Sequence, residues 1–121
     1  MNTYKNTVSL IGRLGKEPET KTFETGNIKT TFSLAVNENF KNKKGEWEEK
    51  TSWHNIICWG KTAERVNEFL KKGAEVMLEG KLTYNKYQTK EGENREICQI
   101  EMRDFAELVQ RKKGVLIPEQ N

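Results

Sequence analysis

Alternation between apolar and polar side chains is the feature that most restricts how this sequence can fold. Over residues 28–37, Phe32, Leu34 and Val36 fall on one side of an extended chain, and polar or small residues fall on the other. Successive side chains of a β-strand point to opposite faces, so this period of two predicts a strand with one buried face. Residues 51–59 are rich in β-branched and aromatic side chains and also predict a strand. The chain is therefore expected to be mainly β-structure.

Three further strands and a short ribbon are predicted around these two. They occupy residues 7–14, 74–89 and about 95–108, with the ribbon at residues 19–24. The long segment 74–89 is expected to bend or bulge near Gly80, because glycine inside a strand often marks such a site.

Only residues 62–72 have the spacing of a helix. The predicted apolar stripe consists of Ala63, Val66, Phe69 and Leu70, and Gly73 is expected to cap the C-terminus. One helix between the third and fourth of five strands is the order of the OB-fold, a small Greek-key barrel. We therefore predict an all-β OB-fold with one helix over residues 1–108, followed by a short polar tail at residues 109–121.

Residues 38–50 form a charged excursion between the second and third predicted strands. The chain is expected to fold back at Lys44-Gly45. A loop of this length in so small a domain is usually functional or disordered.

Several protein classes conflict with the composition. No apolar run approaches the roughly 20 residues that cross a bilayer, and the N-terminus lacks the apolar stretch of a secretory signal, so a cytoplasmic protein is expected. Cys58 and Cys98 are then predicted to be buried free thiols. With His54 as the only histidine and no Cys-x-x-Cys, a zinc site is not expected, nor is any cofactor.

Catalytic readings also fail. Gly60-Lys61-Thr62 has the strand-to-helix context of a phosphate-binding loop, but the motif needs glycine at position 55, which is Asn55. Metal-dependent nucleases need clustered carboxylates, and the only aspartate is Asp104. A hydrolytic triad would need His54 beside Asp104, and nothing in the sequence argues for that. No enzyme is expected.

The distribution of charge is more informative than the net value of +3. Residues 1–90 contain 16 Lys and Arg against 11 Glu, whereas residues 91–121 contain 5 against 7 Asp and Glu. The basic excess accompanies most of the aromatic residues, as a groove for a phosphate backbone would require. Solvated surface lysines remain an equal alternative.

Blocks of residues from Asn6 to about residue 105 resemble the bacterial single-stranded DNA-binding proteins. In chain order, these blocks are Asn6-x-Val8-x-Leu10-Ile11-Gly12-Arg13-Leu14-Gly15-x-x-Pro18-Glu19, Phe32-Ser33-Leu34-Ala35-Val36-Asn37, Trp53-His54-Asn55-Ile56-Ile57, Gly60-Lys61-x-Ala63-Glu64, Phe69-Leu70-x-Lys72-Gly73 and Leu78-Glu79-Gly80-Lys81-Leu82. The resemblance implies an OB-fold that assembles, usually as a homotetramer, and wraps single-stranded DNA. A dimer stays open, as does an OB-fold that binds RNA or acts mainly in protein–protein contacts.

The resemblance assigns base stacking to four aromatic residues. Trp53 and Trp59 match directly, whereas Phe40 and Tyr87 stand where the family often has tryptophan. Alternation independently places Trp53 and Trp59 on one strand face, the alternative being that both rings are in the core. Trp47 and Tyr84 are left open. Tyr84 has the opposite strand parity to Tyr87, so we favour Tyr87.

Phosphate contacts are expected from six basic residues, with an idle solvated charge as the alternative for each. They are Arg13, Lys43, Lys44, Lys61, Lys81 and Lys86. The resemblance implies that His54, on the strand face opposite the tryptophans, lies near a subunit contact.

The end of the sequence departs from the family pattern. Family members usually end in a linker and an acidic tip that recruits replication and repair enzymes, but residues 114–121 contain one acid and no linker. We expect either a truncated sequence or a short variant of the kind that plasmids, phages or mobile elements carry. The expected role is protection of single-stranded DNA in replication, recombination or repair, with recruitment of other enzymes in doubt.

Overall fold

The structure is a computed structural model that describes residues 5–108. In chain order its elements are β1 (Val8–Leu14), β2 (Glu19–Thr22), β3 (Ile28–Lys41), β4 (Trp47–Trp59), α1 (Gly60–Phe69), β5 (Glu75–Gln88) and β6 (Asn94–Leu108). The predicted tail at residues 109–121 lies outside the described residues. Within them, no helix has the length and apolar character needed to span a bilayer.

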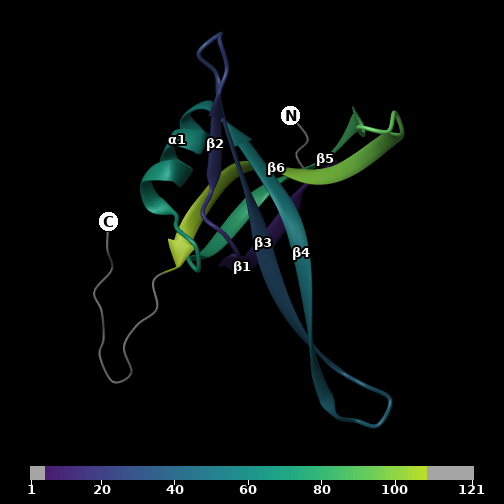
Figure 1. Cartoon of the computed structure of the whole chain (residues 1–121). Coiled ribbons are helices and arrows are strands. Elements are labelled where there is room, and N and C mark those ends of the chain that lie inside the picture. Colours follow the sequence, from purple (N-terminus) through teal and green to yellow (C-terminus); the bar gives the residue numbers. More distant parts are fainter. Residues whose placement is uncertain (1–4, 109–121) are drawn as a thin grey trace, which may run out of the picture.

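Five of the strands close into a barrel (Figure 1). The strand order is β1-β5-β6-β4-β3-β2, and β1 closes the ring by also pairing with β3. The pairings are antiparallel except for β4 with β6, which are parallel at Ile56–Ile100 and Ile57–Glu101. The predicted ribbon is β2, which pairs with β3 outside the closed ring. A five-stranded barrel with one helix after its third strand is an OB-fold, so the predicted fold class is confirmed.

The core fills the barrel with the apolar side of the alternating strands. Its largest fully buried side chains include Leu34, Ile56, Val66, Val76 and Leu78. Burying each such side chain favours the folded state by about 1.5–3 kcal/mol. Helix α1 packs on β3, β4 and β6, with its buried face toward this core.

Helix α1 begins two residues earlier and ends three residues earlier than its spacing predicts. The backbone of Leu70 is already extended, with φ −107° and ψ 139°, while its N–H still donates to the carbonyl oxygen of Val66. Leu70 is nevertheless buried, whereas Phe69 is 53% exposed, so its place in the predicted apolar stripe is wrong. Gly73 therefore belongs to the turn before β5, where its φ of 87° requires glycine.

The predicted irregularity near Gly80 is confirmed. The register between β5 and β6 shifts between Glu79 and Gly80. A Cβ atom at Gly80 would collide with the carbonyl group of Glu101, so the close approach of the two backbones depends on glycine.

The β3–β4 and β5–β6 hairpins project beyond the barrel (Figure 1). In the β3–β4 arm, residues 37–51, the strands stay paired in one register up to Lys41–Trp47. The side chain of Asn42 closes the turn, its Oδ1 accepting from the backbone N–H groups of Lys44 (2.8 Å) and Glu46 (3.0 Å). The charged excursion is therefore a regular hairpin, with its turn close to the predicted Lys44-Gly45. The β5–β6 arm, residues 84–98, turns at residues 89–93.

Candidate nucleic-acid interface

Three exposed aromatic residues, Trp53, Trp59 and Tyr87, lie on the outward side of β3, β4, β6 and β5, which we call the outer sheet face. Opposed residues in paired strands share a face, so the strand register defines its members. On β3 and β4 these include the pairs Ala35–Trp53 and Lys29–Trp59. On β5 and β6 they include Tyr87–Arg95, and the parallel pair Ile57–Glu101 joins the two halves.

Trp59 lies in a ring and cation cluster at the end of β4. Its ring stacks on Phe23 with centroids 5.9 Å apart and an interplanar angle of 24°. The Nζ atom of Lys29 lies 5.5 Å from the Trp59 ring centroid, and Nζ of Lys21 lies 5.0 Å from the Phe23 centroid. Trp59 keeps 40% of its surface exposed.

A hollow of about 540 Å³ opens beside this cluster, and we call it the Trp59 hollow. Its lining comes from four strands: Lys29, Ile57, Trp59, Thr83, Asn85, Tyr87, Ile97, Gln99 and Glu101. Two of the four predicted stacking residues, Trp59 and Tyr87, are thereby brought into one concave surface. Lys29 and Glu101 give it charge of both signs.

Trp53 lies on the outer sheet face, opposite Ala35 on β3. It is 62% exposed, and one edge of its ring lies over Gly15. Six residues separate it from Trp59, which at about 3.4 Å per residue corresponds to about 20 Å along β4. Neither tryptophan belongs to the core, so that alternative is excluded.

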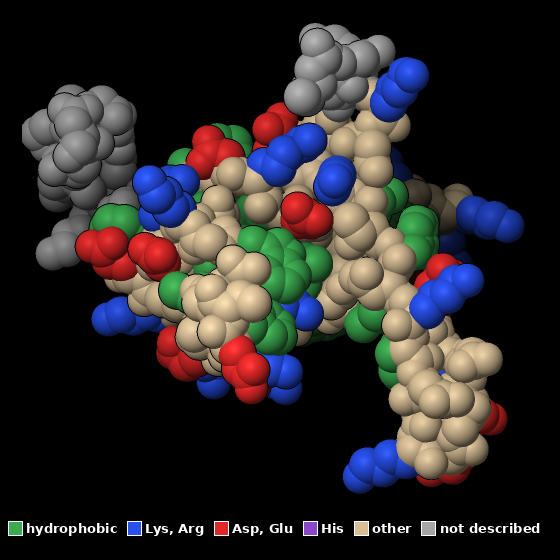
Figure 2. All heavy atoms as spheres, turned by 90° about the horizontal axis from the view of Figure 1, so that it is seen from above, with side chains coloured by type: hydrophobic (Ala, Val, Ile, Leu, Met, Phe, Trp, Pro, Cys, Tyr) green, Lys and Arg blue, Asp and Glu red, His purple; other side chains and the backbone are tan. Residues whose placement is uncertain are grey.

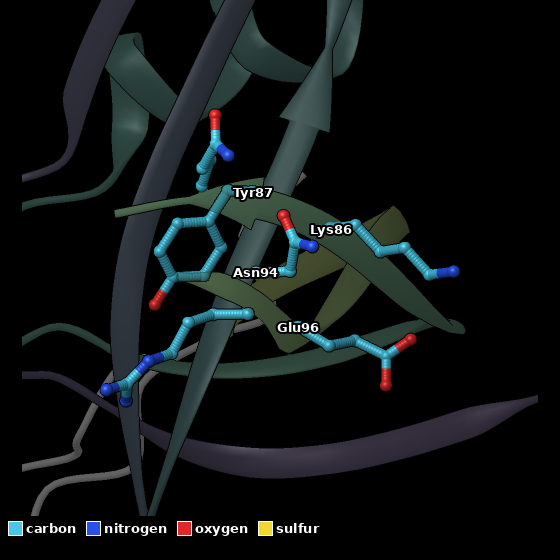
Figure 3. A pocket seen from close by; sticks show the side chains of 6 residues that line it. Lys86, Tyr87, Asn94 and Glu96 are labelled. Atoms are coloured by element: carbon cyan, nitrogen blue, oxygen red, sulfur yellow. The ribbon is translucent and has the colours of Figure 1, made fainter. Parts of the chain in front are cut away.

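Tyr87 also borders a second hollow of about 760 Å³ at the free end of the β5–β6 arm. Its side chain extends to one side of the arm, and those of Lys86 and Glu96 extend to the other (Figure 3). The register agrees, because Tyr87 opposes Arg95 while Lys86 opposes Glu96. Lys86, which is predicted to contact phosphate, therefore lies on the opposite face of the arm from Tyr87.

Phe40 is not brought together with the other three predicted rings. It opposes Glu48 on β4, and this pair lies on the opposite side of the β3–β4 arm from Trp53. Phe40 is 43% exposed. The position facing the same way as Trp53 near the end of the arm is held by Trp47.

The predicted basic residues occupy different parts of the molecule. Arg13 lies in the row of Trp53 and Ala35, where its guanidinium donates to the Gly73 carbonyl oxygen at 3.1 Å and lies 3.7 Å from Glu75. Lys81 opposes Glu101, Lys61 is exposed in the first turn of α1, and Lys43 and Lys44 are in the turn of the β3–β4 arm. Seen from above, basic and acidic side chains surround a central apolar patch (Figure 2).

The groups weighed for catalysis are separate. The Asp104 carboxylate accepts from Arg65 at 3.2 Å and from the Phe105 N–H at 2.9 Å, which holds the pKa of Asp104 below its usual range. His54 is half-buried opposite Leu34 on the inner side of β4. Within residues 5–108, no three His, Cys, Asp or Glu side chains are grouped as a metal site would require.

Both cysteines are free, as predicted, but only Cys58 is buried. The prediction of burial is wrong for Cys98. This residue opposes Tyr84 on the projecting β5–β6 arm, where the inner side of the strand has left the barrel. Burial raises the pKa of the Cys58 thiol to about 12.

Sequence reasoning missed Phe23, Lys21 and Lys29. The position of Lys29 on the outer face can be predicted from the sequence, because Lys29 continues the polar side of the alternating segment 28–37. The position of Phe23 cannot, because its contact with Trp59 depends on β2 folding back along β3.

We compared the chain with known proteins. The chain matches the model of the Single-strand binding protein family over residues 5–108. It is 36% identical over 110 residues to Single-stranded DNA-binding protein 1 of Chlorobaculum tepidum, covering 90% of this chain and 68% of that relative. It is 44% identical over 87 residues to the Single-stranded DNA-binding protein of Neisseria meningitidis serogroup A, covering 72% of this chain and 50% of the relative. The matched segment thus spans about half the length of the Neisseria protein.

Two solved structures share the fold. The Plasmodium falciparum SSB complex with ssDNA has a TM-score of 0.77 and 32% identity, covering 86% of this chain and 95% of that one. A deletion mutant of the single-stranded DNA binding protein from Thermus aquaticus has a TM-score of 0.78 and 25% identity, covering 88% and 51%. With a family match over residues 5–108 and a shared barrel, the chain belongs to the single-strand binding protein family.

Proposed function

We propose that this chain binds single-stranded DNA along the outer sheet face, with bases stacking on Trp59, Tyr87 and Trp53. The observation that carries the proposal is the Trp59 hollow, where two exposed rings and Lys29 share one concave surface. An aromatic face accepts any base, so the binding is not selective for sequence. Stacking of this kind contributes on the order of 1–3 kcal/mol per base in single-strand-binding OB-folds.

Basic side chains near the rings complete the proposed interface, because they can contact the DNA phosphates. Lys21 and Lys29 accompany the Phe23 and Trp59 rings. Arg13 has its guanidinium engaged with Gly73 and Glu75, yet its side chain is 51% exposed, enough to reach a phosphate beside Trp53. Of the other predicted phosphate contacts, Lys81 opposes Glu101 of the Trp59 hollow, and Lys61 follows Trp59 by two residues at the start of α1. Lys43, Lys44 and Lys86 would contact phosphates only if the bound DNA extended along the two arms.

Phe40 stays in the proposal on one condition. A strand of DNA would have to pass around the edge of the β3–β4 arm to reach it, because Phe40 and Trp53 are on opposite sides.

The test is a titration of the protein with oligo-dT, followed by tryptophan fluorescence at two salt concentrations. We expect strong quenching, binding that weakens as salt rises, and weaker binding by W59A and W53A. F69A is the matched control, because Phe69 is a similarly exposed ring on α1 rather than on the outer sheet face. Weak, salt-insensitive binding by the wild type would contradict the proposal. A matched RNA oligonucleotide that binds as tightly as oligo-dT would favour RNA binding instead.

The wider roles belong to the same proposal. We infer a non-catalytic protein that protects single-stranded DNA in replication, recombination or repair in the cytoplasm. Self-association, as a homotetramer or a dimer, with His54 near a subunit contact, is tested by sedimentation of the free protein and of H54A.

A further inference from the structure

Trp47 is the most exposed large apolar side chain among residues 5–108, with 69% of its surface accessible. It is the first residue of β4 and lies on the β3–β4 arm, beyond the barrel. The core is complete without it. A single exposed ring is common on protein surfaces, so the case for a binding role depends on how Trp47 is arranged relative to its neighbours.

Trp47 continues a regular series of tryptophans along β4. Trp47, Trp53 and Trp59 are each six residues apart, and an even spacing on a strand places all three on one face. The strand rise separates neighbouring rings by about 20 Å. The strand register confirms the common face, because their partners on β3 are Lys41, Ala35 and Lys29, which are also spaced by six.

The two ends of this series repeat the same arrangement of ring and cation. Lys41 directly opposes Trp47, and its Nζ atom lies 5.6 Å from the ring centroid. Lys29 directly opposes Trp59, and its Nζ atom lies 5.5 Å from that centroid. Each pair offers a base an aromatic surface and offers the neighbouring phosphate a positive charge.

The arm holds Trp47 in place before any ligand arrives. Its strands pair without a register shift, and Asn42 fixes the turn through its Oδ1. The Asn42 Nδ2 group also donates to Glu48 Oε2 at 2.8 Å, on the side of the arm opposite Trp47. Ordering the backbone that carries the ring lowers the entropy that binding would otherwise lose.

The net charge at the end of the arm is balanced, with Lys41, Lys43 and Lys44 against Glu46, Glu48 and Glu49. Glu46 and Glu48 accept from the Asn42 Nδ2 group, at 3.4 Å and 2.8 Å, whereas Glu49 lies on the tryptophan face between Trp47 and Trp53 and would repel a phosphate. The case for a nucleic acid at this end of the arm therefore depends on the local pairing of Trp47 with Lys41.

We propose that Trp47 and Lys41 form a third contact point for the same single strand of DNA, at the end of the β3–β4 arm. This inference rests on the proposed function, since it extends the strand from Trp59 past Trp53. It assigns to the arm the role of lengthening the stretch of DNA held by one copy of the chain.

A length series of oligo-dT tests this inference. For oligonucleotides long enough to reach the arm, we expect W47A to weaken binding about tenfold, with the loss shrinking as the oligonucleotide is shortened. W53A and W59A, in contrast, should weaken binding at every length. W47F should recover most of the affinity, and F69A should match the wild type.

Salt dependence supplies a second readout. K41Q should lower the slope of log affinity against log salt by about one for long oligo-dT. The inference is overturned if W47A and K41Q bind every length as the wild type does, while W53A is weaker. It is also overturned if W47A changes only the sedimentation of the free protein, because Trp47 would then contact a second copy. Failure of the wild type to bind any oligo-dT would instead reject the proposed function, and the inference with it.

Discussion

The ring of Trp53 lies directly against Gly15, so that a Cβ atom at Gly15 would stand 2.5 Å from Cζ3 of the indole. Gly15 follows β1, and the absence of a side chain there lets the ring settle over the backbone while its other surface stays open to solvent. The turn after β1 thereby sets the position of a residue on β4.

G15A is expected to displace the Trp53 ring and weaken oligo-dT binding by up to the effect of W53A, on the order of 1–3 kcal/mol. Thermal stability should change little, because Trp53 lies outside the core. Titration and thermal unfolding of the same samples measure the two effects. In a double-mutant cycle, G15A should have no further effect on binding once Trp53 is alanine. Additive losses would show that Gly15 acts independently of Trp53.

Phe23 is expected to support Trp59 as a stacking surface. F23A removes the ring at 5.9 Å from Trp59, so the indole gains freedom and loses part of its packing. We expect a shifted tryptophan emission spectrum and weaker binding of oligo-dT. F23L, which retains apolar bulk, should be affected less. Unchanged emission and affinity in F23A would remove Phe23 from the interface.

The two thiols are expected to differ sharply in reactivity. Cys98 is exposed on the β5–β6 arm, whereas Cys58 is fully buried and donates to the Thr30 carbonyl oxygen at 3.6 Å. A thiol-specific chromogenic reagent should therefore label one cysteine quickly in the folded protein and the second only on unfolding. C98S should lack the fast phase. Two fast phases in the wild type would contradict the buried position of Cys58.

Alkaline pH should destabilise the protein partly through Cys58. Burial raises the pKa of this thiol from 9.0 to about 12. Between these values the unfolded chain releases the proton that the folded chain retains, so stability is lost as the pH rises. This contribution is fully present below pH 9.0 and gone as the pH passes 12. Denaturant unfolding at several pH values should show a steeper decline in the wild type than in C58A, and parallel declines would reject the assignment.

The sequence predicted the barrel well because the barrel is where alternation has a physical cause. A strand with one face in the core must alternate, as residues 28–36 do. Residues 51–59 instead indicate a strand through their β-branched and aromatic side chains, and Ile56, Ile57 and Cys58 are all buried. The β3–β4 arm has no buried face, so charged residues occupy both of its sides and the same signal disappears although the strands continue. The sequence therefore predicts an excursion at residues 38–50 and not two continuing strands.

The interface was predictable in part for the same reason. Parity along β4 predicts that Trp53 and Trp59 share one face, and their exposure shows that this is the outer face. Parity along β5 separates Tyr87 from Tyr84. Phe40 is five residues from Ala35, the β3 partner of Trp53, and this odd spacing places Phe40 on the other face. The sequence does not reveal this, because the predicted strand ends at Asn37. The stacking of Phe23 on Trp59 joins two distant segments and follows only from the folded ribbon.

The regular pairing of the β3–β4 arm limits how its length can vary. Because its strands add nothing to the core, residues can be inserted or removed near the turn without opening the barrel. Between Trp47 and Trp53, an insertion of two residues in each strand keeps Trp47 on the side of Trp53, whereas an insertion of one residue in each strand carries it to the opposite side. The reach of the arm can therefore change only in increments of two residues per strand if its tryptophan is to stay aligned with the others.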